Sequence, residues 1–172
     1  MKQLPITLSL IFLLHLTTTQ SSNNLIEETC KKTPHYELCL SSLESNPESK
    51  NSDILGLAHI MINNVLANAT DALDLIRNLL KQAPDPQEER SLAYCAELFI
   101  PVVKYSLPQA IEALIGGHFG FASYGVSDAA KETDACKKSF SGSNQSPLID
   151  RVNVLHELID VAEAIISVLL KG

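Results

Sequence analysis

The sequence predicts an all-α protein: an up-down-up-down four-helix bundle preceded by a short N-terminal helical hairpin, with two disulfides. Three observations lead to this fold. Apolar residues recur every three or four positions along most of the chain, which is the period of one helix face. Alternation of period two and the Asn-Gly or Asp-Gly pairs of β-hairpins are absent from the sequence. The chain also carries an even number of cysteines, four.

The first 22 residues are predicted to be a secretory signal peptide, outside the folded domain. Lys2 precedes an apolar run over residues 8–16, and small polar residues follow. This order is typical of a cleaved export signal. The run is also shorter than the roughly 20 residues that span a bilayer. We therefore expect cleavage between Gln20 and Asn23 and a mature domain over residues 23–172.

The mature domain is expected to be acidic and soluble. Removing the signal takes away Lys2 alone among the charged residues, which leaves 12 basic and 20 acidic residues and a formal charge of −8. An acidic chain repels phosphate backbones and anionic lipids, so binding to nucleic acid or to a membrane surface is not expected. The length fits one domain with a substantial core.

Residues 23–46 are predicted to form the hairpin, and residues 53–171 the bundle. The hairpin is broken at Thr33-Pro34, since proline disfavours helix in the residue before it, and a polar linker follows it. Ser52 or Asp53 is expected to cap the first bundle helix. Prolines inside the second bundle helix predict a kink or break there. The second of these helices is expected to be interrupted near Pro101 and Pro108 and to stop at Gly116-Gly117. The four expected bundle helices cover residues 53–82, 87–115, 122–140 and 147–171.

The positions of the four cysteines favour one disulfide pairing. The midpoint between Cys95 and Cys136 lies beside the glycine pair that ends the second bundle helix, so two helices folded back at that turn bring the two cysteines level. Cys30 and Cys39 flank the proline break of the hairpin. We therefore expect Cys30–Cys39 and Cys95–Cys136. No C-x2-C pair or histidine cluster accompanies them, so no metal site is predicted.

Two sequons for N-glycosylation are present. Asn68 begins Asn-Ala-Thr, and Asn144 begins Asn-Gln-Ser, where Pro147 follows directly and makes the second sequon the weaker of the two.

No catalytic motif is found in the sequence, so neither an enzyme nor a cofactor is predicted. G-x-S-x-G, H-E-x-x-H and a glycine-rich phosphate loop are all missing. His156-Glu157 begins like a zinc-protease motif, but Asp160 stands where the second histidine is required. The adjacent carboxylates of Glu27-Glu28 and Glu88-Glu89 lie at expected helix starts, where they favour the helix dipole.

The segment Gly116-Gly117-His118-Phe119-Gly120-Phe121 joins two expected helices and has two interpretations. Its aromatic side chains either plug the end of the bundle or stand exposed as an anchor for a partner, since rigid aromatic residues are frequent binding hot spots.

Several stretches resemble the plant invertase and pectin methylesterase inhibitor family, over nearly all of residues 24–170. Asn24–Pro34 with Tyr36–Cys39 is similar to the family's N-terminal hairpin. Ser106–Leu114, and His156–Leu158 with Ala164–Leu170, are similar to the invertase-inhibitor branch. All four cysteines fall where the family places its two bridges. The resemblance implies a protein secreted to the cell wall or delivered to the vacuole, which inhibits an acid invertase (β-fructofuranosidase) in a one-to-one complex.

The resemblance also implies an inhibitory contact at residues 118–121. In the invertase-inhibitor branch, a Pro-Lys-Phe tripeptide enters the sucrose-binding cleft, and its place here is taken by Phe119-Gly120-Phe121, in which the last residue alone matches. Gly120 cannot supply the positive charge that complements glycosidase carboxylates. We hypothesise that protonated His118 partly replaces that charge in acid solution, while Phe119 and Phe121 fill the cleft.

Two other functions stay open at this point. The first alternative is inhibition of pectin methylesterase, although that branch usually has an Asp-Tyr pair where His118-Phe119 stands. The more distant alternative is a secreted helical carrier with an apolar cavity between its helices. After secretion, the apoplast is the default location, with the vacuole as the alternative.

Overall fold

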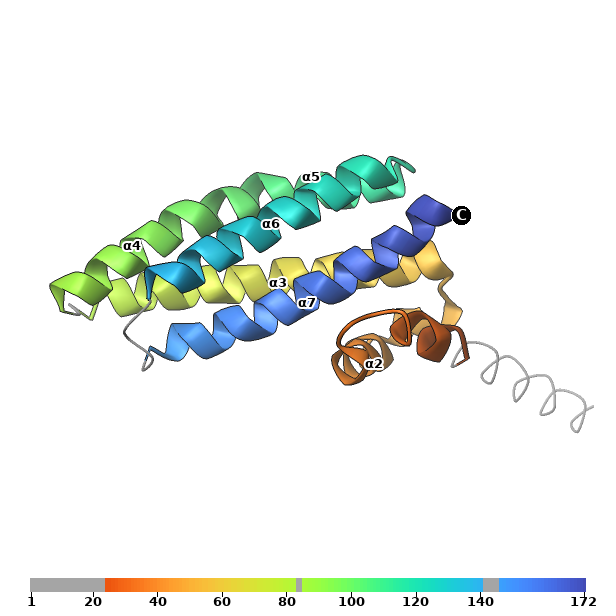
Figure 1. The fold of residues 1–172 in the computed structure, drawn as a ribbon, viewed down its shortest axis with the longest axis horizontal. Helices are drawn as coiled ribbons and strands as arrows, with labels where there is room; N and C mark the ends of the chain where they lie inside the picture. The colour runs from red at the N-terminus through yellow and green to blue at the C-terminus, as the bar shows by residue number, and fades with distance from the viewer. Residues whose placement is uncertain (1–23, 83–84, 141–145) are drawn as a thin grey trace, which may run out of the picture.

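The structure is a computed structural model that describes residues 24–82, 85–140 and 146–172. Every regular element within these ranges is helical, which confirms the predicted fold class (Figure 1). The predicted signal peptide and the sequon at Asn144 lie outside the described residues.

The hairpin consists of a helical stretch over residues 24–30 and α2 (Tyr36–Glu44), joined by the turn that contains Pro34. Ile26 and Leu43 are buried in the common core, so the hairpin packs on the bundle through apolar side chains. The segment after it is more ordered than the polar linker that we expected. It forms a short 3-10 helix, Pro47–Asn51, because the Asn46 side chain accepts a hydrogen bond from the Glu48 amide at 2.9 Å.

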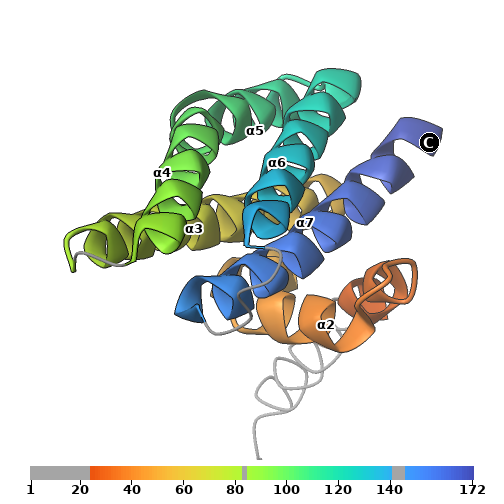
Figure 2. The same cartoon turned by 60° about the vertical axis from the view of Figure 1, so that its left-hand side comes forward.

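Four long helical rods form the bundle, and they alternate in direction (Figures 1 and 2). As expected, Asp53 caps the first rod, and its carboxylate accepts a hydrogen bond from the Gly56 amide at 2.9 Å. The first rod packs against the second and the fourth, and the third rod also packs against those two. The rods are α3 (Ile54–Leu80), α4 (Pro86–Pro101) continued by η2 (Val102–Ser106) and α5 (Leu107–Ile115), α6 (Phe119–Ser139) and α7 (Pro147–Lys171).

The break predicted inside the second rod is a π-helical segment, η2. The Leu107 amide bonds to the carbonyl of Val102, five residues back. Pro108 has no amide hydrogen and Pro101 ends α4, so regular α-helical bonding cannot pass through both prolines. A single π turn accommodates this interruption, and the rod bends there toward α6.

One helical run among the described residues, Pro86–Ile115, has the length and the mean hydropathy, 1.3, of a membrane-crossing helix. In this structure the run packs against α3 and α6. A disulfide also joins it to α6. The apolar residues of the run that are buried in the core of the bundle are Leu92, Cys95, Phe99, Val102, Leu107, Ala110 and Leu114.

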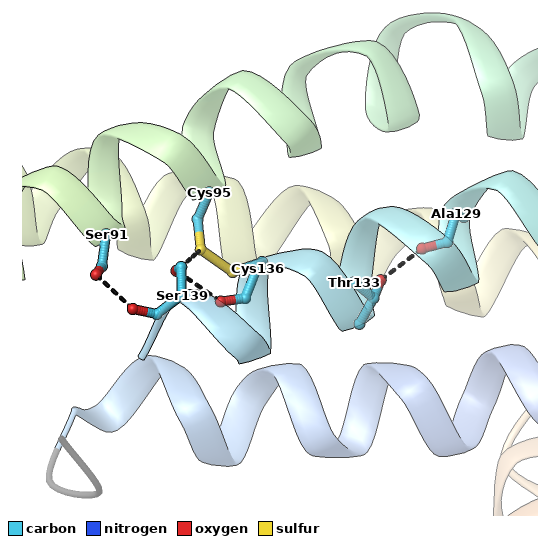
Figure 3. Close-up of a disulfide and its surroundings, with 6 residues drawn as sticks. All are labelled: Ser91, Cys95, Ala129, Thr133, Cys136 and Ser139. Atoms are coloured by element: carbon cyan, nitrogen blue, oxygen red, sulfur yellow. Dashed lines mark hydrogen bonds between the residues drawn. A yellow bond between two sulfur atoms is a disulfide. The ribbon is translucent and has the colours of Figure 1, made fainter. Parts of the chain in front are cut away.

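The two disulfides have the pairing that the cysteine positions favour. Cys30–Cys39 closes the hairpin, and Cys95–Cys136 joins α4 to α6. Figure 3 shows the second bond beside two polar contacts. The hydroxyl of Ser91 donates to the Ser139 carbonyl at 2.7 Å, and the hydroxyl of Ser139 donates to the Cys136 carbonyl at 2.7 Å. This end of α6 is therefore fixed to α4 by covalent and hydrogen bonds together.

Candidate functional site

The turn between α5 and α6 is a tightly hydrogen-bonded helix end. Gly117 has a φ of 75°, the left-handed conformation that glycine adopts without strain. The His118 amide donates to the Ala113 carbonyl at 2.8 Å, and the Gly117 amide donates to the Leu114 carbonyl at 3.1 Å. These two bonds form the Schellman motif of a helix C-terminus. The turn that carries the candidate residues is consequently short and fixed.

The helix after this turn begins earlier than predicted. α6 starts at Phe119, whereas the sequence led us to expect a start at Ala122. The backbone explains the difference, because the carbonyl of His118 already accepts hydrogen bonds from the amides of Phe121 and Ala122, at 3.0 and 3.1 Å. His118 makes no side-chain cap, so the usual sequence signal for a helix start is missing.

The two phenylalanines of the turn take different positions. Phe121 is 75% exposed, and the His118 ring lies edge-on to it with 6.4 Å between ring centres. Phe119 is half-buried and packs against the core. Phe119 thus partly closes the bundle end, and Phe121 projects from it. His118 and Gly120 are exposed beside them.

A groove of about 990 Å³ lies directly behind these residues. Its walls come from the α5–α6 turn, from α5 and from the end of α7, whose Leu170 is 51% exposed. It is an open groove beside exposed aromatics, unlike the cavity between helices that a carrier requires. Residues lining it include Gln109, His118, Phe121, Tyr124, Leu169 and Leu170.

The groove is uncharged in neutral solution, although the chain as a whole is strongly acidic. Among the described residues that line it, none is Asp, Glu, Lys or Arg. His118 is the one histidine among these lining residues. The groove can therefore offer a partner an apolar and aromatic surface.

Close contact between α5 and α6 fixes the direction of the turn. A Cβ atom added at Gly125 would lie 2.7 Å from the Ser106 carbonyl oxygen and 2.9 Å from the Ala110 Cβ. No larger residue fits this crossing without a shift of the backbone. The hydroxyl of Ser106 also donates to the carboxylate of Asp128 at 2.8 Å. Phe121 is one helical turn from Gly125 and is held at a defined angle.

Sequence reasoning missed two members of this surface, Tyr124 and Leu170. Tyr124 is 68% exposed and lies one turn after Phe121 on α6. The spacing of three residues between two exposed aromatics was a readable signal, because residues i and i+3 share a helix face. Leu170 has no such signal, since its position beside α6 depends on the packing of the whole bundle.

The remaining candidates from the sequence lie elsewhere. The carboxylates of Glu27 and Glu28 bind Lys31 at 3.0 and 3.2 Å, and these hydrogen bonds, first that of Glu27, raise the pKa of Lys31. Glu88 and Glu89 lie in the first turn of α4, as expected for helix-start charges.

The first sequon lies in the middle of α3. The amide of Asn68 donates to the Asn64 carbonyl at 2.9 Å, and the hydroxyl of Thr70 donates to the Leu66 carbonyl at 2.7 Å. Both side chains are thus bonded to their own helix. Glycosylation at Asn68 stays a prediction.

Comparisons with known proteins agree with the resemblance seen in the sequence. Residues 24–165 match the plant invertase/pectin methylesterase inhibitor family. The chain is 36% identical over 145 residues to the cell wall/vacuolar inhibitor of fructosidase 1 of Arabidopsis thaliana. The aligned region covers 84% of this chain and 69% of that relative. It is 32% identical over 155 residues to the pectinesterase inhibitor of Actinidia deliciosa, and the aligned region covers 89% of this chain and 83% of that relative.

A solved structure shares the fold. The crystal structure of a mutant form of a pectin methylesterase inhibitor from Arabidopsis superposes with a TM-score of 0.72, covering 80% of this chain and 92% of that one at 21% identity. The family match spans most of the chain, and three relatives exceed 30% identity over most of their length. The chain therefore belongs to the plant invertase/pectin methylesterase inhibitor family, whose members are enzyme inhibitors and not enzymes.

Proposed function

We propose that this protein inhibits a plant acid invertase by inserting the α5–α6 turn into the enzyme's substrate cleft. The observation that carries the proposal is the exposure of Phe121, 75%, on a turn fixed by backbone hydrogen bonds. A rigid exposed aromatic costs little conformational entropy on binding, which is why such residues are common hot spots.

Support for invertase as the target comes from the chain's relatives. Two relatives above 30% identity are named as cell wall/vacuolar inhibitors of fructosidase, both from Arabidopsis thaliana. By residue count back from Cys136, Phe121 also corresponds to the phenylalanine of the tripeptide that the family resemblance implies. We propose the same class of target for this chain, in a one-to-one complex, after export to the cell wall or vacuole.

The shape of the turn suggests how inhibition would work. Phe121 would enter the cleft first, with His118 beside it and Tyr124 one helical turn behind. Since Phe119 is packed against the core, we assign it the role of supporting the turn, whereas the sequence alone suggested that it fills the cleft. The groove behind the turn would then receive the rim of the cleft.

Pectin methylesterase is the second candidate target. It is favoured by the 32% identity to a pectinesterase inhibitor, which covers 89% of this chain. The two targets make different demands on the turn, because a glycosidase cleft carries two catalytic carboxylates that attract a protonated His118.

The proposal is tested by incubating the mature protein separately with a purified plant acid invertase and a plant pectin methylesterase, at pH 5. We expect concentration-dependent loss of invertase activity that saturates at one inhibitor per enzyme. Loss of pectin methylesterase activity alone would establish the second candidate and overturn the first. No loss of either activity would overturn both.

The His118→Ala variant is expected to weaken invertase inhibition in acid solution more than in neutral solution. Histidine side chains in general gain a positive charge between neutral and acid solution, and a positive charge at this position would be attracted by the carboxylates of a glycosidase cleft. Loss of one charge pair at a partly hydrated interface corresponds to roughly a threefold to tenfold increase in the inhibition constant at pH 5.

The inhibition constants of the variant and the wild type are measured at both pH values and expressed as a ratio. This ratio cancels the effect of pH on the enzyme itself. His118→Gln keeps a polar side chain of similar size without the charge and should behave like His118→Ala. An equal ratio at the two pH values would refute a role for the His118 charge.

A further inference from the structure

A positive charge lies beside the exposed aromatic side chains of α6, on a residue that does not line the groove. The Nζ atom of Lys131 is 5.9 Å from the centre of the Tyr124 ring, within the roughly 6 Å over which a cation is attracted to an aromatic face. Tyr124 is 68% exposed, and Lys131 is exposed as well. The pair therefore stands at the surface of the bundle, where a partner can reach both side chains.

The geometry of the helix explains how the two side chains meet. Tyr124 and Lys131 are seven residues apart on α6, about two helical turns, so they lie on the same face. Side chains on an α-helix lean toward its N-terminus, and α6 begins at the α5–α6 turn (Figure 1). The long side chain of Lys131 thus carries its charge back along the helix in the direction of Phe121.

The ammonium group of Lys131 is available to a partner. Within the described residues, Lys131 takes part in the ring contact and in no ion pair. Asp128 lies one helical turn before it, but its carboxylate accepts a hydrogen bond from the hydroxyl of Ser106 in η2, at 2.8 Å. An ammonium group has three hydrogen-bond donors, and an aromatic face offers them no oxygen acceptor. A carboxylate on a partner can therefore bind Lys131 without displacing an ion pair.

This local charge matters because the rest of the chain is acidic. The formal charge at neutral pH is −7, and no Asp, Glu, Lys or Arg is present among the described residues that line the groove. The chain as a whole consequently does not attract an acidic partner over long distances. Attraction to such a partner has to come from positive side chains at the contact surface itself.

We propose that Tyr124 and Lys131 form a second contact with the inhibited invertase, in which Lys131 binds a carboxylate on the rim of the substrate cleft. This inference rests on the proposed function, because insertion of Phe121 brings the Tyr124 face of α6 to the rim. A glycosidase cleft carries two catalytic carboxylates, and a cleft lined by one sign of charge concentrates its electric field. That field attracts the Lys131 ammonium.

The two residues have different roles in this contact. Lys131 supplies a charge, which acts on the rate of association and on specificity. Tyr124 is a positioning residue for that charge, because a lysine side chain already held over a ring loses less conformational entropy on binding than a free one. Lysine side chains in general are charged in acid and neutral solution alike, so this contact does not depend on His118.

Inhibition of a purified acid invertase by the mature protein at pH 5 tests the contact, in about 20 mM and about 500 mM NaCl. We expect Lys131→Glu to raise the inhibition constant roughly tenfold in low salt, because repulsion replaces attraction. In high salt the increase should fall below about threefold, because salt screens exposed charges. Lys131→Ala should give a smaller increase with the same salt dependence.

Lys137→Glu is the matched control for the charge. Lys137 is an exposed lysine of the same helix, about 9 Å further from the turn along the helix axis. Its substitution changes the net charge of the protein by the same amount, and it should leave the inhibition constant within about twofold at both salt concentrations. Thermal unfolding checks that each variant is folded.

A double-mutant cycle tests the positioning role of Tyr124. Tyr124→Phe keeps an aromatic face and should inhibit within about twofold of the wild type. Tyr124→Leu keeps an apolar side chain without the ring, and in that background the effect of Lys131→Glu should fall from roughly tenfold to roughly threefold. An undiminished effect of Lys131→Glu in the Tyr124→Leu background would overturn the positioning role.

The outcomes separate this inference from the proposed function. If the wild type inhibits invertase and Lys131→Glu inhibits equally well, the second contact is refuted and the proposed function stands. Equal losses for Lys131→Glu and Lys137→Glu would also refute the contact, because net charge would then account for both. A wild-type protein that does not inhibit invertase would overturn the proposed function and this inference together.

Discussion

Phe121→Ala is expected to raise the inhibition constant against acid invertase by about 30-fold or more at pH 5. Truncating an aromatic hot spot costs about 2 kcal/mol or more of binding free energy, which corresponds to that factor. The side chain is 75% exposed, so its removal should change folding stability by less than about 0.5 kcal/mol. Inhibition assays and thermal unfolding on the same preparation separate the two effects.

Tyr105→Ala is the matched control for this prediction. Tyr105 is another exposed aromatic, 59% exposed, but it lies in η2 and does not line the groove. Its truncation should leave the inhibition constant within about twofold. A Phe121→Ala variant that folds normally and inhibits as well as the wild type would refute the proposed insertion of the turn.

Removal of the α4–α6 disulfide is expected to produce the largest loss of stability. In the chain-entropy account, a bond between residues 41 positions apart contributes about 4 kcal/mol by restricting the unfolded chain. The double variant Cys95→Ala with Cys136→Ala leaves no free thiol and buries no new polar group. For a domain of this size, its melting temperature should fall by about 8–16 °C.

The hairpin disulfide provides the comparison. Cys30 and Cys39 are separated by 9 positions, so removing this bond should cost about 3 kcal/mol by the same account. Both free energies can be measured by urea unfolding.

A loss below about 1 kcal/mol in the Cys95→Ala, Cys136→Ala variant would contradict the entropic role. At temperatures where that variant stays folded, inhibition should persist, because Cys136 lies about 25 Å along α6 from the turn.

Much of the fold was predictable because the chain marks its helix boundaries with local signals. Asp53 supplies a capping side chain, and Gly116-Gly117 ends the second rod. Pro101 and Pro108 predicted an interruption, but not its π-helical form, which depends on how η2 packs against α6. The start of α6 was misplaced by three residues because His118 caps the helix with its backbone alone.

The candidate site was predictable in its position along the chain and not in its surroundings. Residues 118–121 stood out by composition and by family resemblance. Which phenylalanine projects outward was decided by the helical phase of α6, fixed by the close approach of Gly125 to Ser106. The groove, and the hydrogen bond between His35 of the hairpin and Asp160 of α7, bring together segments separated by tens to more than a hundred positions, and no local pattern encodes such proximity.

Gly120 gives the turn an unusual freedom. A Cβ atom placed there meets no atom within 4 Å, so a side chain can begin at this position without a clash with its neighbours. A single codon change could thus retune which enzyme the protein recognises, and a lysine installed at this position would re-create the basic residue of the invertase-inhibitor tripeptide. In such a scaffold, substitutions in the α5–α6 turn can change the target enzyme while the disulfide-linked helices stay the same.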